Sequence, residues 1–305
     1  MVRQQGQCHR SQSGSTGMLR LKGVVIRAVS LDCQGTLYRH RAPIEEVYAR
    51  LAKPLLPDPP SSDEFKVAFR QSYSDTLRSY PQYRFPGPSA DAYSTRRWWR
   101  ELCRRSLELT GRTYSDDDID RFFRSVYQHY GSSLGYEAYP DANDLLAAFA
   151  AHNSSGSSTP EAPSVLVGVT ANVSSRTLDT TLPGLGMHDN LHFFTSSQEA
   201  GSDKPSLAVF AETLRRLQRW APGIQKNQVL HVGSSVALDY VAAREFGFSA
   251  LLLDRDGAAA SAGAAAGAAG AGADDLHLQH HLEANTVRGL GEVAARLGLK
   301  PAAAR

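Results

Sequence analysis

One stretch near the N-terminus, residues 24–37, constrains the fold of this chain more than any other. Its first part reads Val-Val-Ile-Arg-Ala-Val-Ser-Leu, a short and mostly apolar run typical of strands buried in parallel sheets. Asp32 follows this run at once, and Gly35 then allows a sharp turn. Because ligands bind at the carboxyl ends of strands in open α/β sheets, Asp32 is predicted to face a binding crevice.

Four further apolar segments, at 165–170, 193–195, 228–233 and 249–254, are predicted to be strands. Helical patterns alternate with them from about residue 137 onward. This alternation predicts an α/β fold, a doubly wound Rossmann-like parallel sheet. Residues 43–135 show only helical periodicity, which predicts an all-helical cap inserted after the first strand. That position places the cap over the carboxyl edge of the sheet.

The α/β core is therefore predicted to comprise residues 23–42 and 136–305, with two flexible parts. Residues 1–31 hold five Lys or Arg and no acidic residue, so 1–22 are predicted to be either a disordered basic tail or a mitochondrial or plastid transit peptide. Residues 257–273 consist almost entirely of Ala and Gly and are predicted to be a flexible insertion within the core.

The composition excludes two classes of partner. The net charge is only +2 and no stripe of Lys and Arg occurs, so nucleic acid is not expected to bind. No apolar stretch approaches the roughly 18 residues that a membrane span needs. Cys8, Cys33 and Cys103 are widely spaced and predict free thiols in a reducing, intracellular compartment, cytoplasmic or, with a transit peptide, organellar. Nothing in the sequence bears on the oligomeric state.

Polar residues follow the predicted strands closely. In a doubly wound sheet the carboxyl ends of the strands converge on one crevice, so these residues are expected to form a single site. They are Asp32 and Thr36 after the first strand, Thr170 and Asn172 at the end of the second, Lys204 after the third, and Ser234, Ser235 and Asp239 after the fourth.

With these residues the chain resembles haloacid dehalogenase (HAD) superfamily hydrolases that carry a helical cap after the first motif. The likeness extends into the cap at Phe69-Arg70-Gln71-Ser72-Tyr73 and at Arg97-Trp98-Trp99, and it covers roughly residues 24–255. On a helix, Trp98 and Trp99 point about 100° apart, so one is expected in the cap core and the other at the seam between cap and core. His231, inside a strand, is expected to be a hydrogen-bonded core residue.

The resemblance implies a hydrolase that attacks a small anionic substrate, in the first place a phosphoester. Asp32 would be the nucleophile and form an aspartyl ester, with Thr36 hydrogen-bonding near it. Asn172 would position the transferred group, Lys204 would stabilise the negative charge, and Asp239 would orient Lys204 or a water.

Three positions depart from the pattern that the resemblance implies. Gln34 stands where phosphatases of the superfamily carry an aspartate as general acid. Ser234 stands where a carboxylate usually binds Mg²⁺, which leaves Asp32, with Asp239 through a water, as a poor Mg²⁺ site. Ala171 precedes Asn172 where Ser or Thr is expected.

These departures, together with the polar residues around them, lead to two further interpretations. By a one-residue shift, Thr170 would take the place of the Ser or Thr missing at position 171. Gln34, Thr170, Ser234 and Ser235 are assigned to substrate binding.

Two alternatives to a phosphatase-like enzyme follow from the same departures. One is a catalytically inactive binding or scaffold protein, a pseudoenzyme. The other is a metal-independent 2-haloacid dehalogenase-like activity, since those enzymes also have Gly-Thr-Leu after the nucleophile and a Ser-Ser-x-x-x-Asp motif. Val236 and Phe210 argue against the second alternative, because that pattern has Asn and Tyr at these positions.

Overall fold

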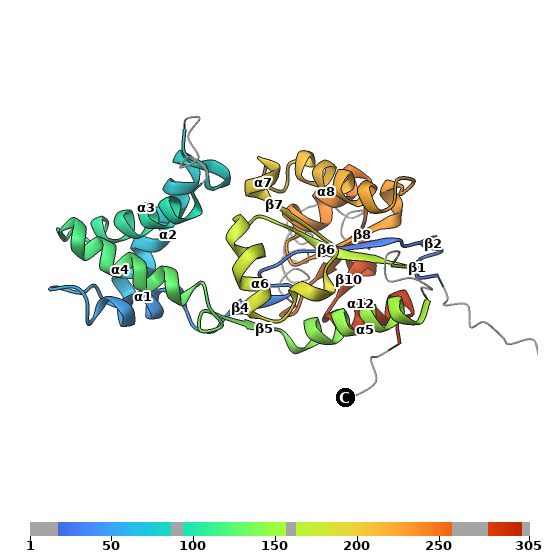
Figure 1. Ribbon diagram of the computed structural model, residues 1–305, viewed down its shortest axis with the longest axis horizontal. Coiled ribbons are helices and arrows are strands. Elements are labelled where there is room, and N and C mark those ends of the chain that lie inside the picture. The colour runs from blue at the N-terminus through green and yellow to red at the C-terminus, as the bar shows by residue number, and fades with distance from the viewer. Residues whose placement is uncertain (1–17, 87–93, 157–162, 258–279, 301–305) are drawn as a thin grey trace, which may run out of the picture.

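The computed structural model of the chain describes residues 18–86, 94–156, 163–257 and 280–300 (Figure 1). A six-stranded sheet lies at its centre, with the strand order β10-β9-β8-β3-β6-β7, and every neighbouring pair is parallel. This arrangement confirms the predicted α/β fold. The strands are β3 Ala28–Leu31, β6 Leu166–Ala171, β7 Phe193–Ser196, β8 Val229–Gly233, β9 Ser249–Leu253 and β10 Thr286–Val287.

Helices cover both faces of the sheet, as its apolar strands require. Every residue of β3, β6 and β8 is buried. On one face the sheet packs against α5 Pro140–Gly156 and α12 Leu290–Leu297, and on the other against α8 Leu207–Trp220 and α9 Ala242–Phe246 (Figure 1). Short segments include η3 Thr177–Thr181, α6 Leu182–Gly184, η4 His188–Asn190, α7 Ser197–Ala200, η5 Lys226–Gln228 and η6 Val236–Val241.

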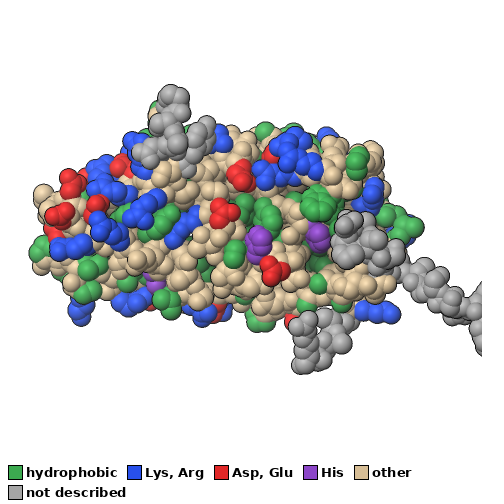
Figure 2. All heavy atoms as spheres, in the orientation of Figure 1, with side chains coloured by type: hydrophobic (Ala, Val, Ile, Leu, Met, Phe, Trp, Pro, Cys, Tyr) green, Lys and Arg blue, Asp and Glu red, His purple; other side chains and the backbone are tan. Residues whose placement is uncertain are grey.

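Four helices form a separate group at the left of Figure 1, all between residues 44 and 129. The connection to the core is a two-stranded ribbon in which β4 Tyr38–His40 pairs antiparallel with β5 Tyr136–Ala138. Over this group Figure 2 shows acidic and basic side chains interspersed. The helices are α1 Ile44–Ala52, α2 Ser62–Ser79, α3 Thr95–Glu108 and α4 Asp116–His129, and η1 Pro81–Tyr83 follows α2.

Local sequence explains where these cap helices begin and how they pack. Ser61 and Ser115 each open a helix with a capping box, in which the serine side chain and the acidic residue three positions on satisfy each other's backbone N–H groups. Trp98 is fully buried in the cap, with its ring 5.8 Å from that of Tyr73. Trp99 lines the cavity between cap and core, so the two tryptophans divide as expected.

The structure differs from the sequence-based expectations at the ends of the core. Val24 and Val25 form β2, which pairs with β1 Arg20–Leu21 in a hairpin outside the main sheet. Leu19 and Leu21 are buried in the core, so the ordered core starts before residue 23. Strand β10, with only two residues, carries too short a pattern for prediction. Residues 1–17 and almost all of the Ala/Gly run 257–273 lie outside the described residues. No helix within the described ranges is long and apolar enough to cross a membrane.

Candidate active site

Three charged side chains meet at the carboxyl edge of the sheet. Asp32 follows β3, Lys204 follows β7 and α7, and Asp239 lies in η6 after β8. The Lys204 Nζ lies 2.6 Å from Asp32 Oδ1 and 2.5 Å from Asp239 Oδ1. The side chain of Lys204 is 2% exposed and that of Asp32 is 14% exposed, so only the latter is open to a substrate. The structure thus brings together three residues that are up to 207 positions apart, from 32 to 239.

One ammonium group shared by two carboxylates leaves this cluster with a net negative charge. Burial disfavours the charged Lys204, but Asp32 and Asp239 outweigh it and raise the pKa of Lys204 above its usual range. Burial raises the pKa of Asp239, but Lys204 and His231 outweigh it and hold that pKa below the usual range. For Asp32, burial is the largest effect, and with the charge of Asp239 it raises the pKa against the attraction of Lys204.

Asp239 is the fixed member of the cluster. Its Oδ2 accepts a hydrogen bond of 2.9 Å from the backbone N–H of Ser235. Its Oδ1 lies 3.1 Å from His231 Nε2, and the other ring nitrogen of His231 is 3.1 Å from Ser30 Oγ. His231 is the buried core residue that the sequence predicts, but its support of Asp239 was missed. The available signal was a polar residue in the middle of an apolar strand.

Asn172 holds the backbone of Lys204 in place. The Asn172 Nδ2 donates to the Lys204 carbonyl oxygen at 2.8 Å, and the Lys204 N–H donates to Asn172 Oδ1 at 2.7 Å. The amide nitrogen and the amide oxygen of Asn172 therefore both bond the backbone of Lys204. Asn172 also lines the cavity described below, so it lies beside the space in which a substrate would be held.

Two residues assigned to substrate binding, Thr170 and Ser235, make hydrogen bonds to other groups of the protein. Thr170 is fully buried, and its hydroxyl lies 2.8 Å from both Ser30 Oγ and Thr213 Oγ1, on the side of α8. Ser235 caps η6, because its hydroxyl accepts from the backbone N–H of Leu238. Thr170 therefore lies in the core, out of reach of a substrate, whereas Ser235 caps the helix start while half-buried, and its assignment to substrate binding stays a prediction.

The remaining predicted residues lie at different depths on or opposite the loop that carries Asp32. Thr36 is buried, and its hydroxyl has no hydrogen-bond partner within the described part of the chain. Gln34 is exposed, and its Nε2 lies 3.5 Å from His40 Nδ1. Ser234 is also exposed, and its Oγ would lie 2.9 Å from a Cβ built on Gly35, which places it opposite the nucleophile loop.

The described side chains offer few ligands to a Mg²⁺ ion. Among the described residues, no group of three or more His, Cys, Asp or Glu side chains could hold a metal. Both oxygens of Asp239 accept hydrogen bonds from the protein, and the residue is 2% exposed. Ser234 offers a neutral hydroxyl where a carboxylate would be needed. Mg²⁺ is usually bound through one or two carboxylates together with substrate phosphates and waters, and here only Asp32 remains.

A cavity of about 270 Å³ lies between the cap and the core. Gln34, Asn172 and Ser174 line it from the core, and Tyr48 and Trp99 line it from the cap. The cavity therefore extends from the loop that carries Asp32 into the space beneath the cap helices.

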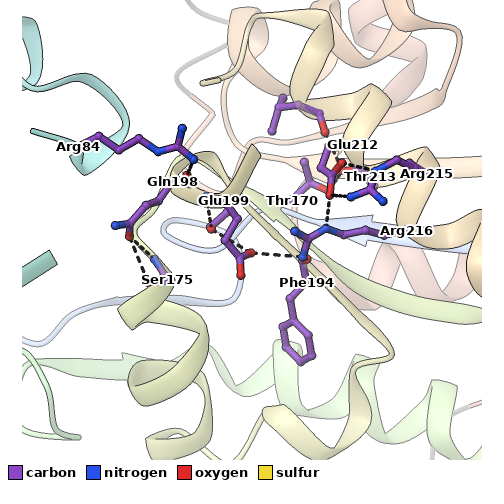
Figure 3. A network of polar contacts seen from close by, with 12 residues as sticks. Arg84, Thr170, Ser175, Phe194, Gln198, Glu199, Glu212, Thr213, Arg215 and Arg216 are labelled. Atoms are coloured by element: carbon purple, nitrogen blue, oxygen red, sulfur yellow. Dashed lines mark hydrogen bonds and ion pairs between the residues drawn. The ribbon is translucent and has the colours of Figure 1, made fainter. Parts of the chain in front are cut away.

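Polar contacts join the cap to the core, among them the contact of Arg84 with Gln198 (Figure 3). Arg84 donates to the carbonyl oxygen of Gln198. The Gln198 Oε1 accepts from Thr95 Oγ1 at 3.0 Å and from the backbone N–H of Ser175 at 2.9 Å. A further bond of 2.5 Å joins Gln82 Nε2 to Asp203, the residue before Lys204.

Comparison with known proteins identifies the family of this arrangement. A family model described as haloacid dehalogenase-like hydrolase matches residues 26–247. Haloacid dehalogenase-like hydrolase domain-containing protein 3 of Danio rerio is 27% identical over 264 residues, 85% of this chain and 99% of its own length. The human protein of that name is 25% identical over 75% of this chain and 82% of its own length. These matches confirm the resemblance seen in the sequence.

Solved structures of low identity share the fold. L-2-haloacid dehalogenase from Xanthobacter autotrophicus superposes with a TM-score of 0.54 at 18% identity, over 89% of this chain and 98% of that one. The putative HAD-hydrolase YfnB from Bacillus subtilis, solved bound to magnesium, gives a TM-score of 0.55 at 14% identity, over 90% and 99% of the two chains. At such identities the likeness concerns the fold alone.

Proposed function

We propose that this chain, which belongs to the haloacid dehalogenase-like hydrolase family, hydrolyses a small anionic phosphoester through a covalent intermediate on Asp32. The observation that carries the proposal is the position of Lys204, whose Nζ lies between Asp32 Oδ1 and Asp239 Oδ1. A buried ammonium group in contact with a partly exposed carboxylate orients the nucleophile and opposes the charge that develops on a transferred group.

The first step is the attack of Asp32 on phosphorus. Lys204 holds Oδ1, and Oδ2 has no hydrogen-bond partner within the described residues, so Oδ2 is the oxygen available to attack. As the bond between Oδ2 and phosphorus forms, the bond to the leaving oxygen breaks and that oxygen takes the electron pair. Lys204 stays protonated throughout, because its pKa is raised above the usual range.

The second step is hydrolysis of the aspartyl phosphate. Water attacks the intermediate, the bond to Asp32 breaks, and the electron pair returns to the carboxylate. The released phosphate keeps both hydrogens of the water. Asp239 holds the ammonium of Lys204 in place through both steps, because Ser235 and His231 fix the Asp239 carboxylate.

Gln34 limits which substrates the site can turn over. An amide side chain cannot protonate the leaving oxygen, and general acid catalysis is typically worth about 10²–10⁴-fold. Leaving groups that are stable as anions lose least from its absence. A phenol, with a pKa near that of tyrosine at about 10, is such a group, whereas an aliphatic alcohol is closer to water at about 15.7. The site therefore favours aryl over alkyl esters.

A second candidate function is favoured by the pair of substitutions at Gln34 and Ser234. A halide leaving group needs neither a proton nor a metal ion, so attack of Asp32 on carbon is compatible with losing the acid and the metal carboxylate together. Release of chloride from 2-chloropropionate in the presence of a chelator would be measured with an ion-selective electrode. Absence of release would remove this candidate.

The test of the proposed function is a panel of aryl and alkyl phosphates, assayed with and without Mg²⁺. Asp32→Asn is expected to lower turnover of an aryl phosphate by about 10⁴-fold or more, because it removes the nucleophile. The matched control is Asp189→Asn, since that aspartate is fully exposed and distant from the site in η4. If wild type and Asp32→Asn are equally inert across the panel, the proposed function fails, and absence of chloride release as well would leave a non-catalytic binding or scaffold protein.

A further inference from the structure

The cavity between the cap and the core has walls from both parts of the chain. The core supplies Gln34 from the nucleophile loop and Asn172 from the end of β6. The cap supplies Tyr48 from α1, Phe69 from α2 and Trp99 from α3. A group attached to a phosphorus atom at Asp32 would therefore extend past Gln34 into this cavity.

The walls are aromatic and carry no formal charge. Eight of the fifteen lining residues are Tyr, Phe or Trp, and none is Asp, Glu, Lys or Arg. The one histidine, His40, is kept neutral near pH 7, since burial lowers its pKa. A ligand group with its own charge would find no counter-charge on these walls and would lose its hydration.

The aromatic side chains already form a connected set of ring contacts. The His40 ring stacks on Tyr136 with centroids 5.1 Å apart, and Tyr130 lies 5.7 Å from Tyr136. Tyr48 meets Phe69 edge to face at 5.3 Å. Planar rings gain from such edge-to-face and offset contacts beyond the area that they bury. A planar ring in the cavity would extend this set, whereas a flexible aliphatic chain would not.

The size of the cavity suits one or two rings. A dry apolar cavity of about 150 Å³ is enough to bind benzene. At about 270 Å³, this cavity has room for a second ring or for substituents on the first.

One residue that lines the cavity, Tyr130, carries a polar group without a partner in the part of the chain that the structure describes. The Tyr130 hydroxyl is buried and makes no hydrogen bond within the described residues. Buried hydroxyl groups are normally hydrogen-bonded, so an unpaired one on a lining residue would gain a partner from a polar atom of the ligand once the tyrosine turns toward it. The ligand ring is therefore expected to carry a hydroxyl or carbonyl group.

We propose that this cavity binds the leaving-group part of the substrate, and that this part is an uncharged aromatic ring bearing a hydroxyl or carbonyl group. That the bound part is the leaving group rests on the proposed function. It agrees with the absence of a general acid at Gln34, because an aryl oxide departs without protonation. Binding to the cavity is, however, separate from catalysis.

The experiment measures binding of 2-naphthol by calorimetry to the full-length Asp32→Asn protein, in which turnover is removed. 2-Naphthol is expected to bind about tenfold more tightly than cyclohexanol, which lacks the ring, and than 6-hydroxy-2-naphthoate, which adds a charge. Tyr130→Phe is expected to weaken 2-naphthol binding about three- to tenfold.

Cavity-filling variants locate the binding. Ile44→Trp fills the cavity from α1 and Thr177→Trp fills it from the core, so either one, if folded by circular dichroism, should abolish binding. Leu109→Trp, which adds the same ring at an exposed position at the end of α3, should bind as the parent does.

Equal affinity for cyclohexanol or for the naphthoate would overturn the proposal, as would unchanged 2-naphthol binding in both folded cavity-filling variants. The outcome is independent of activity. If 2-naphthol binds as expected but no ester is hydrolysed by the wild type, the cavity assignment stands and the proposed function fails. If esters are hydrolysed while aromatic binding is absent, the reverse holds.

Discussion

Asn172 and Lys204 are joined by two hydrogen bonds, of 2.8 Å and 2.7 Å, that run in opposite directions between one amide side chain and one backbone unit. The ammonium group of the same lysine lies between Asp32 and Asp239. The Asn172 side chain, just past the end of β6, thus fixes the loop that carries Lys204. We infer that Asn172 positions Lys204.

The first prediction concerns these two hydrogen bonds between Asn172 and Lys204. Asn172→Ala removes both hydrogen bonds, and a misplacement of about 1 Å at a reacting centre can cost about 10²-fold. We expect kcat for an aryl phosphate to fall by about 10–10²-fold while KM changes little. Steady-state kinetics would check this. A variant with unchanged kcat and raised KM would show that Asn172 binds substrate and does not position Lys204.

The second prediction separates the two carboxylates by their contributions to stability at pH 7. Asp239→Asn loses a tightly bound charge and is expected to lower the free energy of unfolding by about 3 kcal/mol. Asp32→Asn removes a carboxylate whose ionised form burial disfavours, and Lys204 keeps Asp239 as a partner, so this variant should be at least as stable as the wild type. Urea unfolding of both variants would check this, and equal destabilisation would contradict it.

The third prediction is the pH dependence of the same difference. The pKa of Asp239 is lower in the folded protein than in the unfolded chain, where it is about 3.9. Its stabilising contribution is therefore fully present above about pH 4 and is lost as the pH falls further toward the folded value. The gap in unfolding free energy between the wild type and Asp239→Asn should be constant from pH 7 to 5 and shrink below pH 4. A gap that widens on acidification would refute the assignment.

A fourth prediction uses the close approach of Gly233 to Asp239. A Cβ on Gly233 would lie 2.2 Å from Asp239 Cγ, whereas a Cβ on Gly223 would meet nothing within 4 Å. Gly233→Ala should displace Asp239, cost about 1–3 kcal/mol of stability and abolish turnover. Gly223→Ala should change stability by less than about 0.5 kcal/mol and leave turnover intact. Thermal melts and the aryl phosphate assay would compare the two.

The fifth prediction restores the missing groups. Gln34→Asp adds a general acid and Ser234→Asp adds a carboxylate opposite the nucleophile loop, since Ser234 Oγ already approaches Gly35. The double variant is expected to hydrolyse alkyl phosphates about 10²–10⁴-fold faster than the parent, and only with Mg²⁺. Assays with added Mg²⁺ or with a chelator would measure this. If the variant gains nothing, the departures at these positions do not limit the parent.

Much of the site could be predicted because it is encoded locally. A buried strand shows as an apolar run, and the residues that follow it closely lie at the edge of the sheet, which is how Asp32 and the segment with Asp239 were found. The cap was predicted from helical periodicity alone. The direction of a side chain at a strand end was harder to predict from the sequence. Thr170 lies two residues before Asn172, yet it is still inside β6, where its hydroxyl contacts Thr213 of α8, whereas Asn172 lies past the end of the strand.

What lay beyond prediction depends on contacts between distant segments. His231 reads as an ordinary core residue, and only the pairing of β8 with β3 sets it between Ser30 and Asp239. Strand β10 and the β1–β2 hairpin are two-residue pairings that exist because a neighbouring strand lies beside them. The cavity is formed by cap and core together, so no single stretch of sequence contains it.

The sequence by itself determined the fold and placed Asp32 and Gln34 in the turn after a buried strand, since these follow from residue type and local pattern. The tertiary structure alone decided that Lys204 is shared by two carboxylates and that an uncharged aromatic cavity adjoins Gln34. The physical reason is that ion pairs and cavities depend on distances between side chains. Those distances are set by how the strands, the ribbon and the cap helices pack, and not by their order along the chain.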